Sequence, residues 1–341
     1  MAAVTGAALD AVEVGGLIRE DVMEKIWQID NVPLPLTMRI GTDSHDRSYN
    51  EWTTEELAAP ATDNAAVDGA DITTDDEKLG ERKGNHSQIS TKRVTVSTRS
   101  QNSGTIGYAN ALSHQISQRQ KELRRDVEAT MLSSNGSVAD DGASTPGQSA
   151  GLGAWIETNE ANASTTTGGG FQTTGLVTAR TGYDSGSVAL TESAVRAVSK
   201  AIYEEGGEAV VAMGTPSVIE SFSSYLFTSS ARVAALQSDV NQQRSAVTAT
   251  GAVNVFVSDF STLEMVPNRI QPAEATGVSN LYILDPSMLR LSFLHGYRVE
   301  PQAKTGLADK RQMCVDWSLK VLNEKAQGAV FNIDETAPVT A

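Results

Sequence analysis

The sequence has one cysteine, Cys314, in 341 residues, and no apolar run that approaches the ~20 residues needed to span a bilayer. A single cysteine excludes an internal disulfide framework and fits a reducing cytoplasm. The first residues, MAAVTGAALDAVEVGG, carry acids and lack the basic region of a signal peptide. We therefore expect a soluble protein that is made and used without secretion and without contact with a membrane.

Basic residues are also scarce: the sequence has 27 Lys and Arg against 42 Asp and Glu, which gives a formal charge of −15. This balance argues against nucleic-acid binding by the protein as a whole, so any contact with a polyanion has to be local. With 40% hydrophobic residues, the chain has enough apolar material for two or three domains.

The motifs of common enzymes are missing. The sequence contains no Walker loop, no G-x-S-x-G elbow, no paired cysteines and no His-Glu-x-x-His helix. Its four histidines are scattered among unrelated neighbours, and the acidic stretch 63–78 lacks the spacing of a calcium-binding loop. We predict that the protein is not an enzyme and has no catalytic residues, cofactor or metal site.

One long amphipathic segment dominates what is present. From about Ser103 to Ser133, helical spacing predicts one apolar stripe with charged residues on the other faces. The stripe consists of Tyr108, Leu112, Ile116, Leu123, Val127 and Met131. We expect this helix to lie on a sheet formed by later strands.

Weaker patterns flank this helix. Residues 17–29 predict an amphipathic helix or an extended arm, with Leu17 or Ile18, Val22, Ile26 and Ile29 on one face. The alternation in residues 87–99 predicts the returning strand of a long two-stranded excursion. The stretch from Ser133 to Ser187 is a Gly/Ser/Thr-rich loop anchored by Trp155 and Ile156.

The remaining chain predicts α/β structure followed by strands. Thr191 is positioned to cap a helix that ends at Gly206 or Gly207, and Thr215-Pro216 to start another. Strands are predicted at 209–213, 253–260, 280–284, 288–294 and 312–322, and the tail beyond Gly328 is expected to be partly ordered at most.

Several strings give the chain a family resemblance. They are GLIREDVMEKIWQIDNVPLPLTMRIG, YNEWTTEELAAP, SGTIGYANALSHQISQRQKELRRDVE, LGAWIETN and the stretch LYILDPSMLRLSFLHGYRVEPQAKTGLADKRQMCVDWSLKVLNEKAQGAV. In this order they resemble the major capsid proteins of tailed double-stranded DNA bacteriophages. The resemblance is to a subgroup with an Arg-Glu-Asp phrase, here Arg19 to Asp21, and a Tyr-x-x-Trp phrase, here Tyr49 and Trp52.

The resemblance implies an α+β fold of the Hong Kong 97-like capsid type. Residues 1–47 would be an N-terminal arm and 48–100 an extended loop that lies on a neighbouring subunit. Residues 101–189 and 261–341 would form the peripheral domain, with the long spine helix and a β-sheet. Residues 190–260 would form an α/β axial domain around the five-fold and six-fold positions of a shell.

The resemblance also implies partners and a location. The subunit would self-assemble as pentamers and hexamers into an icosahedral shell enclosing double-stranded DNA without sequence-specific binding. A separate scaffolding protein, a portal and decoration proteins would join it, first in the host cytoplasm and then in the virion capsid. Other classes that stay open are a tail-tube, fibre or appendage component and a hydrolase with dispersed carboxylates.

Candidate contact residues follow from these expectations. Trp52 opens the extended loop, and the helix carries a basic cluster formed by Arg119, Lys121, Arg124 and Arg125. The cluster could face DNA on the inner surface, or form salt bridges with the acidic N-terminal arm or a neighbour's loop. We predict that these five residues make assembly or inner-surface contacts.

Overall fold

The computed structural model describes residues 33–60, 62–69, 71, 79–103, 107–162, 165–183, 186–228, 255–304 and 306–339. The amphipathic segment expected at 17–29 lies outside the described residues. Two larger sheets and one two-stranded sheet form the structure. One cluster of buried side chains is shared by the two larger sheets, and a second cluster lies on the other face of the six-stranded sheet.

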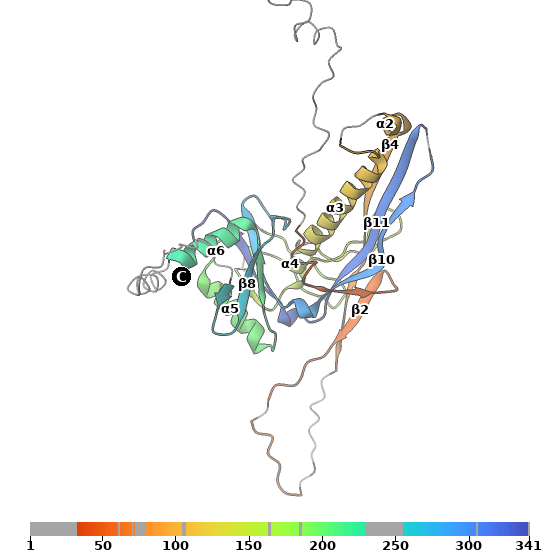
Figure 1. Ribbon diagram of the computed structural model, residues 1–341. Helices are drawn as coiled ribbons and strands as arrows, with labels where there is room; N and C mark the ends of the chain where they lie inside the picture. The colour runs from red at the N-terminus through yellow and green to blue at the C-terminus, as the bar shows by residue number, and fades with distance from the viewer. Residues whose placement is uncertain are drawn as a thin grey trace, which may run out of the picture.

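The first sheet has four strands and supports the long helix. β1 (Gly41–Ser44) runs parallel to β10 (Leu289–Pro301), which pairs antiparallel with β11 (Ala308–Val321), and β11 pairs with β4 (Gln88–Ser97). In Figure 1 the helix α3 (Ala111–Met131) runs alongside the long strands β4 and β11. The predicted alternation of β11 is confirmed, since every second residue from Met313 to Val321 is at most 1% exposed.

The apolar stripe of α3 meets this sheet as predicted. Leu123, Val127 and Met131 are at most 1% exposed, and Tyr108, Leu112 and Ile116 pack against the same cluster. The predicted start of the helix near Ser103 is wrong. Gly107 has a φ of 84°, and the helix begins only after Asn110, whose side chain accepts a hydrogen bond from the Ser113 amide. A separate short helix, α2 (Thr98–Asn102), precedes it.

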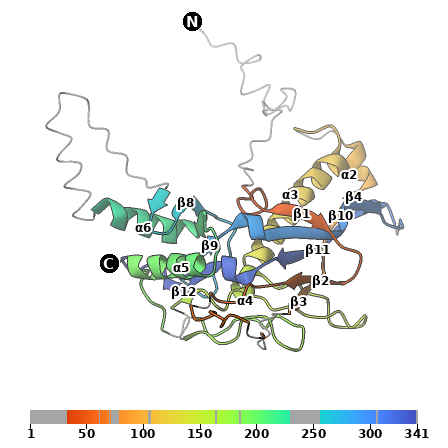
Figure 2. The ribbon, with the colours of Figure 1, turned by 90° about the horizontal axis from the view of Figure 1, so that it is seen from below.

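The second sheet has six strands. Its order is β5 (Glu160–Ala161), β12 (Gly328–Asp334), β9 (Val278–Leu284), β6 (Val211–Gly214), β8 (Thr262–Pro267) and β7 (Val255–Val257). The helices α5 (Glu192–Glu204) and α6 (Pro216–Thr228) lie on one side of it in Figure 2. As predicted, the Thr191 side chain caps α5 by accepting a hydrogen bond from the Ala194 amide, and Val195, Val198 and Ile202 are buried.

The structure differs from several predictions about this sheet. The tail beyond Gly328 was expected to be partly ordered at most, yet it forms β12, paired with β9, and Ala329 and Phe331 are fully buried. The strand expected at 253–260 is shorter, and β8 was not predicted. The predicted boundary at residue 260 also does not separate the units, because β8, β9 and β12 from the later range complete the sheet that packs on α5 and α6.

The expected two-stranded excursion has different strands from those predicted. β2 (Tyr49–Thr54) pairs with β3 (Glu81–His86), in register from Tyr49 opposite His86 to Thr54 opposite Glu81. β4, which was expected to be the returning strand, instead lies in the four-stranded sheet because Val94 and Val96 pack in its core. Beyond β2 the chain leaves the body of the molecule (Figure 1), and Leu57 and Val67 are 95% and 79% exposed.

Short helical turns join these parts. α4 (Leu152–Trp155) is buried throughout, which confirms that Trp155 and Ile156 anchor the Gly/Ser/Thr-rich loop. The 3₁₀ turns η2 (Pro286–Met288) and η3 (Glu324–Ala326) connect β9 to β10 and β11 to β12. The side chains of Asp285 and Asn323 cap them.

Candidate functional site

The base of the β2–β3 hairpin is anchored by aromatic side chains. The ring centroid of Trp52 lies 5.5 Å from that of Trp155, which in turn stacks on Phe171 at 5.8 Å. The Lys320 ammonium lies 5.9 Å from the Trp52 ring centroid. Trp52 is 8% exposed, and its ring holds the hairpin to the body of the subunit, so its contact with a neighbouring subunit stays a prediction.

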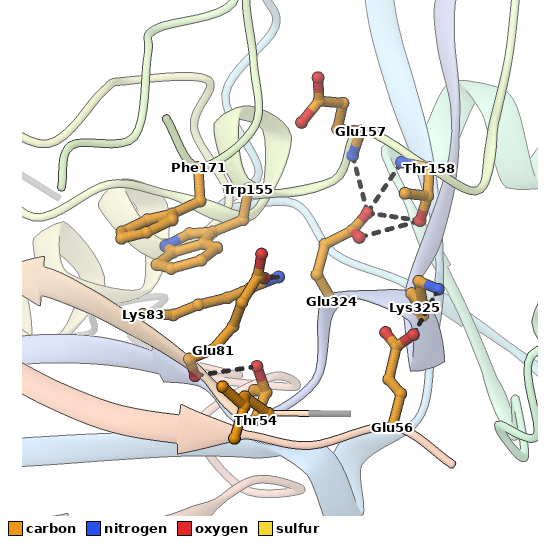
Figure 3. Close-up of a pocket in the computed structure, with 11 residues that line it drawn as sticks. Thr54, Glu56, Glu81, Lys83, Trp155, Glu157, Thr158, Phe171, Glu324 and Lys325 are labelled. Atoms are coloured by element: carbon orange, nitrogen blue, oxygen red, sulfur yellow. Dashed lines mark hydrogen bonds and ion pairs between the residues drawn. The ribbon is translucent and has the colours of Figure 1, made fainter. Parts of the chain in front are cut away.

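A hollow of about 400 Å³ opens beside this aromatic stack, at the root of the hairpin. Figure 3 shows how its walls come from the hairpin, α4, the Gly-rich loop and η3. The lining residues are Thr54, Glu56, Leu79, Glu81, Lys83, Trp155, Glu157, Thr158, Phe171, Glu324 and Lys325.

Two charged side chains of this hollow, Glu324 and Lys325, have hydrogen-bonding and ion-pair partners within the subunit. The Glu324 carboxylate accepts hydrogen bonds from the Glu157 amide at 2.8 Å, the Thr158 amide at 2.9 Å and the Thr158 hydroxyl at 2.8 Å. The Lys325 ammonium contacts the carboxylates of Glu56 and Glu205, each at 3.0 Å. Lys325 thereby links Glu56, just beyond β2, and Glu205, at the end of α5, to η3.

A histidine fixes the point where the hairpin leaves the sheet. The His45 ring nitrogens lie 2.8 Å from Ser292 Oγ and 2.6 Å from Ser87 Oγ, which links the ends of β1 and β3 to a residue within β10. Burial lowers the pKa of His45, and it also lowers the pKa of His86, whose ring packs 4.7 Å from that of Tyr49. The Tyr49 hydroxyl donates to Gly175 O at 2.6 Å, so both strands of the hairpin are held at their base.

The four predicted basic residues lie together on α3, away from Trp52 on the hairpin. Arg119 is half-buried and forms an ion pair with Glu122 one turn along the helix, and Lys121 is also half-buried. Arg124 and Arg125 are exposed, and the Arg124 guanidinium lies 5.4 Å from the Tyr297 ring centroid. The exposed part of the cluster is therefore Arg124 and Arg125.

The sequence analysis missed Glu128, which lies on the buried side of α3 and is fully buried. Its carboxylate accepts hydrogen bonds from the Leu36 amide at 2.8 Å, the Thr37 amide at 2.9 Å, the Thr37 hydroxyl and Asn268 Nδ2 at 3.0 Å. Four donors satisfy the buried charge and tie residues 36–37 to the helix and to the end of β8. The available signal was an acid three residues before Met131, beside the apolar stripe.

Arg180 was missed as well. Its guanidinium donates to Gly153 O at 3.1 Å, Ile156 O at 2.6 Å, Thr166 Oγ1 at 3.0 Å and Glu160 Oε2 at 2.7 Å, and lies 4.0 Å from the Phe331 ring centroid. It is 5% exposed. One side chain thus fastens the Gly/Ser/Thr-rich loop to α4 and β12, and nothing in the local sequence marks it.

Among the residues that the structure describes, no group of three or more His, Cys, Asp or Glu side chains is placed to hold a metal ion. The same part of the chain contains no helix both long and apolar enough to cross a membrane.

Comparison with known proteins gives one family. A family model described as the SU10 major capsid protein matches residues 3–334. The major capsid protein of Escherichia phage Phieco32 is 30% identical over 99 residues, which are 29% of this chain and 28% of that protein. The match therefore spans less than a third of this curated relative.

Solved structures give the fold. The capsid asymmetric unit of cyanophage A-1(L) has a TM-score of 0.59 at 13% identity, with 94% of this chain and 98% of the other covered. The SrpI encapsulin of Synechococcus elongatus PCC 7942 has a TM-score of 0.57 at 11% identity, with 97% and 98% covered. These likenesses show the Hong Kong 97-like α+β fold predicted from the sequence.

Proposed function

Because the chain belongs to the SU10 major capsid protein family, we propose that it is the subunit that self-assembles into the icosahedral shell of a tailed bacteriophage. The family match over residues 3–334 carries this proposal, since it spans the long helix and both sheets. The fold is consistent with it, because phage capsids and an encapsulin resemble the same architecture. The role is structural rather than enzymatic.

The projecting hairpin loop supports contact between subunits. Leu57, Val67 and Leu79 are 95%, 79% and 85% exposed, so the projecting loop offers three large apolar side chains for contact with a neighbour. A two-stranded hairpin is marginally stable alone, so we place residues 48–86 as the extended loop that lies on a neighbouring subunit. β4, to residue 97, belongs instead to the sheet beneath the spine helix.

The two sheets suggest a division of the subunit. We assign α3 and the four-stranded sheet to the peripheral domain, and α5, α6 and the six-stranded sheet to the axial domain, which would gather at five-fold and six-fold positions. Residues 1–47 would serve as the N-terminal arm. A subunit with several neighbours would bury interfaces of roughly 1,200–2,000 Å² each, so many modest contacts would add up to a stable shell.

The negative net charge of the chain is compatible with a shell that encloses DNA. The net charge of −15 would limit adhesion of the enclosed polyanion, since a strongly basic lining would bind phosphates and hinder packing and release. Arg124 and Arg125 are the exposed helix residues that could make local contacts with DNA or with a neighbour. A separate scaffolding protein, a portal and decoration proteins complete the proposed assembly in the host cytoplasm.

Negative-stain microscopy tests the proposal. Expression together with the phage's scaffolding protein is expected to give closed particles of uniform size. Leu57→Asp combined with Val67→Asp should leave the thermal melt of the subunit unchanged but reduce particle formation, whereas the exposed control Thr62→Asp should still assemble. Persistent monomers of the unaltered chain would refute shell formation, and tubes or trimers would indicate a tail or fibre component instead.

A further inference from the structure

The start of the described chain is fixed beside one end of the six-stranded sheet. The Arg39 guanidinium donates to Glu264 Oε1 of β8 at 2.8 Å, while Glu128 accepts the amides of Leu36 and Thr37. Asn268, just beyond β8, donates to the same Glu128 carboxylate. These contacts hold residues 36–39 against the β8 end of the sheet. The residues that precede Pro33 are therefore connected to the fold at this place.

An apolar surface is left open at the same place. Val255 lies opposite Glu264 and Val257 opposite Thr262, and directly opposed residues point to the same face of a sheet. Val255 and Val257 are 47% and 68% exposed, and Met38, beside Arg39, is 77% exposed. Phe256 points the other way and packs against Phe222 of α6 at 5.3 Å between ring centroids. We call Val255, Val257 and Met38 the β7 surface.

We propose that residues 17–29 of the same chain dock on the β7 surface through the stripe of Leu17 or Ile18, Val22, Ile26 and Ile29. The spacing of these residues places them on one face of a helix, which matches a single open face on the sheet. Only residues 30–32 separate Ile29 from Pro33, and three or four residues reach roughly 10–14 Å. That reach suits a surface adjoining Arg39 better than a distant one.

The short connection formed by residues 30–32 explains how so small a surface can bind residues 17–29. Three apolar side chains would bind a free peptide weakly, because association costs translational and rotational freedom. A short linker replaces that cost with an effective concentration in the range of mM. This inference concerns the single subunit and does not depend on shell formation, so it is tested on unassembled protein.

Disulfide trapping provides the first test. In a Cys314→Ser background, Ile26→Cys combined with Val257→Cys is expected to give an oxidised monomer that migrates faster on a non-reducing gel. The matched control, Gln28→Cys with Val257→Cys, places the thiol outside the apolar stripe and should crosslink several-fold more slowly. Equal rates in both pairs, or no crosslink, would overturn the proposal; a crosslinked dimer would do so too, because it would make a second copy the occupant.

Hydrogen exchange of the full chain gives a second readout that needs no added cysteine. Ile26→Asp should speed exchange of the amides in 255–257 by about tenfold, while amides of the buried strand β9 stay unchanged. Gln28→Asp, which adds the same charge outside the stripe, should have little effect. If Ile26→Asp leaves 255–257 as protected as in the unaltered chain, the segment does not cover the β7 surface.

Discussion

The Glu128 carboxylate lies 2.8 Å from the Leu36 amide nitrogen, and 92 residues separate the two in the chain. Through this contact α3 holds residues 36–37, near the start of the described chain. The same carboxylate accepts a hydrogen bond from Asn268 Nδ2, so one buried group connects residues 36–37, α3 and the segment that follows β8. Glu128 therefore contributes to the relative orientation of these three parts, together with the Arg39–Glu264 ion pair.

Glu128→Ala should destabilise the subunit by about 3 kcal/mol, because the buried amides of Leu36 and Thr37 and the Asn268 side chain lose their acceptor. Glu128→Gln keeps one acceptor oxygen and should cost clearly less. Urea denaturation of both variants measures the difference. Equal losses for Ala and Gln would contradict the expectation that one retained acceptor oxygen preserves part of the stability.

Leu123→Asp should abolish soluble folded subunits, because Leu123 is 1% exposed and the new charge would be buried without a partner. Arg124→Ala together with Arg125→Ala should leave the fold intact, with a loss of about 0.5–1 kcal/mol from the Arg124–Tyr297 contact, and should alter assembly. Circular dichroism and thermal melts compare the two. The reverse order of damage would contradict the assignment of the helix faces.

Arg180→Ala should cost about 3–5 kcal/mol, since it leaves the buried Gly153 and Ile156 carbonyl groups and the Glu160 carboxylate without their donor. Arg196→Ala is the matched control, because its side chain is 41% exposed and its ion pairs lie on the surface; its loss should stay below about 1 kcal/mol. Urea denaturation gives the energies. Limited proteolysis should show earlier cleavage within 137–183 only for Arg180→Ala.

Burial raises the pKa of Glu274 to about 7, although the Ser134 hydroxyl donates to its carboxylate at 2.7 Å and favours the charged form. The unfolded chain ionises this group near pH 4.5, so the folded state binds more protons between that value and pH 7. This stabilising contribution is complete below about pH 4.5 and is lost as the pH rises through about 7.

The glutamine of Glu274→Gln is neutral at all pH values. The free energy of unfolding of this variant should therefore rise by about 2–3 kcal/mol relative to that of the unaltered chain between pH 4.5 and pH 8. The measurement is the free energy of unfolding in urea across that range. Glu208→Gln, at an exposed position, serves as the control. A difference between Glu274→Gln and the unaltered chain that does not change with pH would show that Glu274 titrates normally in the folded state.

Regular, local patterns account for what could be predicted. The stripe on α3, the alternation of β11 and the Thr191 cap depend on residues close together in sequence, and the structure confirms them. The strand β12 was not predicted because its partner β9 lies about 50 residues away in the sequence. Only the pairing with β9 and the burial of the β12 side chains make this tail a strand. β4 was assigned to the wrong partner for the same reason.

The sequence by itself determined the family resemblance, the capsid fold class and the apolar faces, since these follow from composition, periodicity and recognisable strings. Only the tertiary structure decided that Trp52 is buried against Trp155 and that Glu128 and Arg180 make buried polar contacts between distant segments. It also decided that each of the two larger sheets combines strands from before and after residue 260. Each of these depends on side chains brought together from distant segments. Local propensity carries no information about such partners, because the energy of a buried charge is set by the donors that surround it.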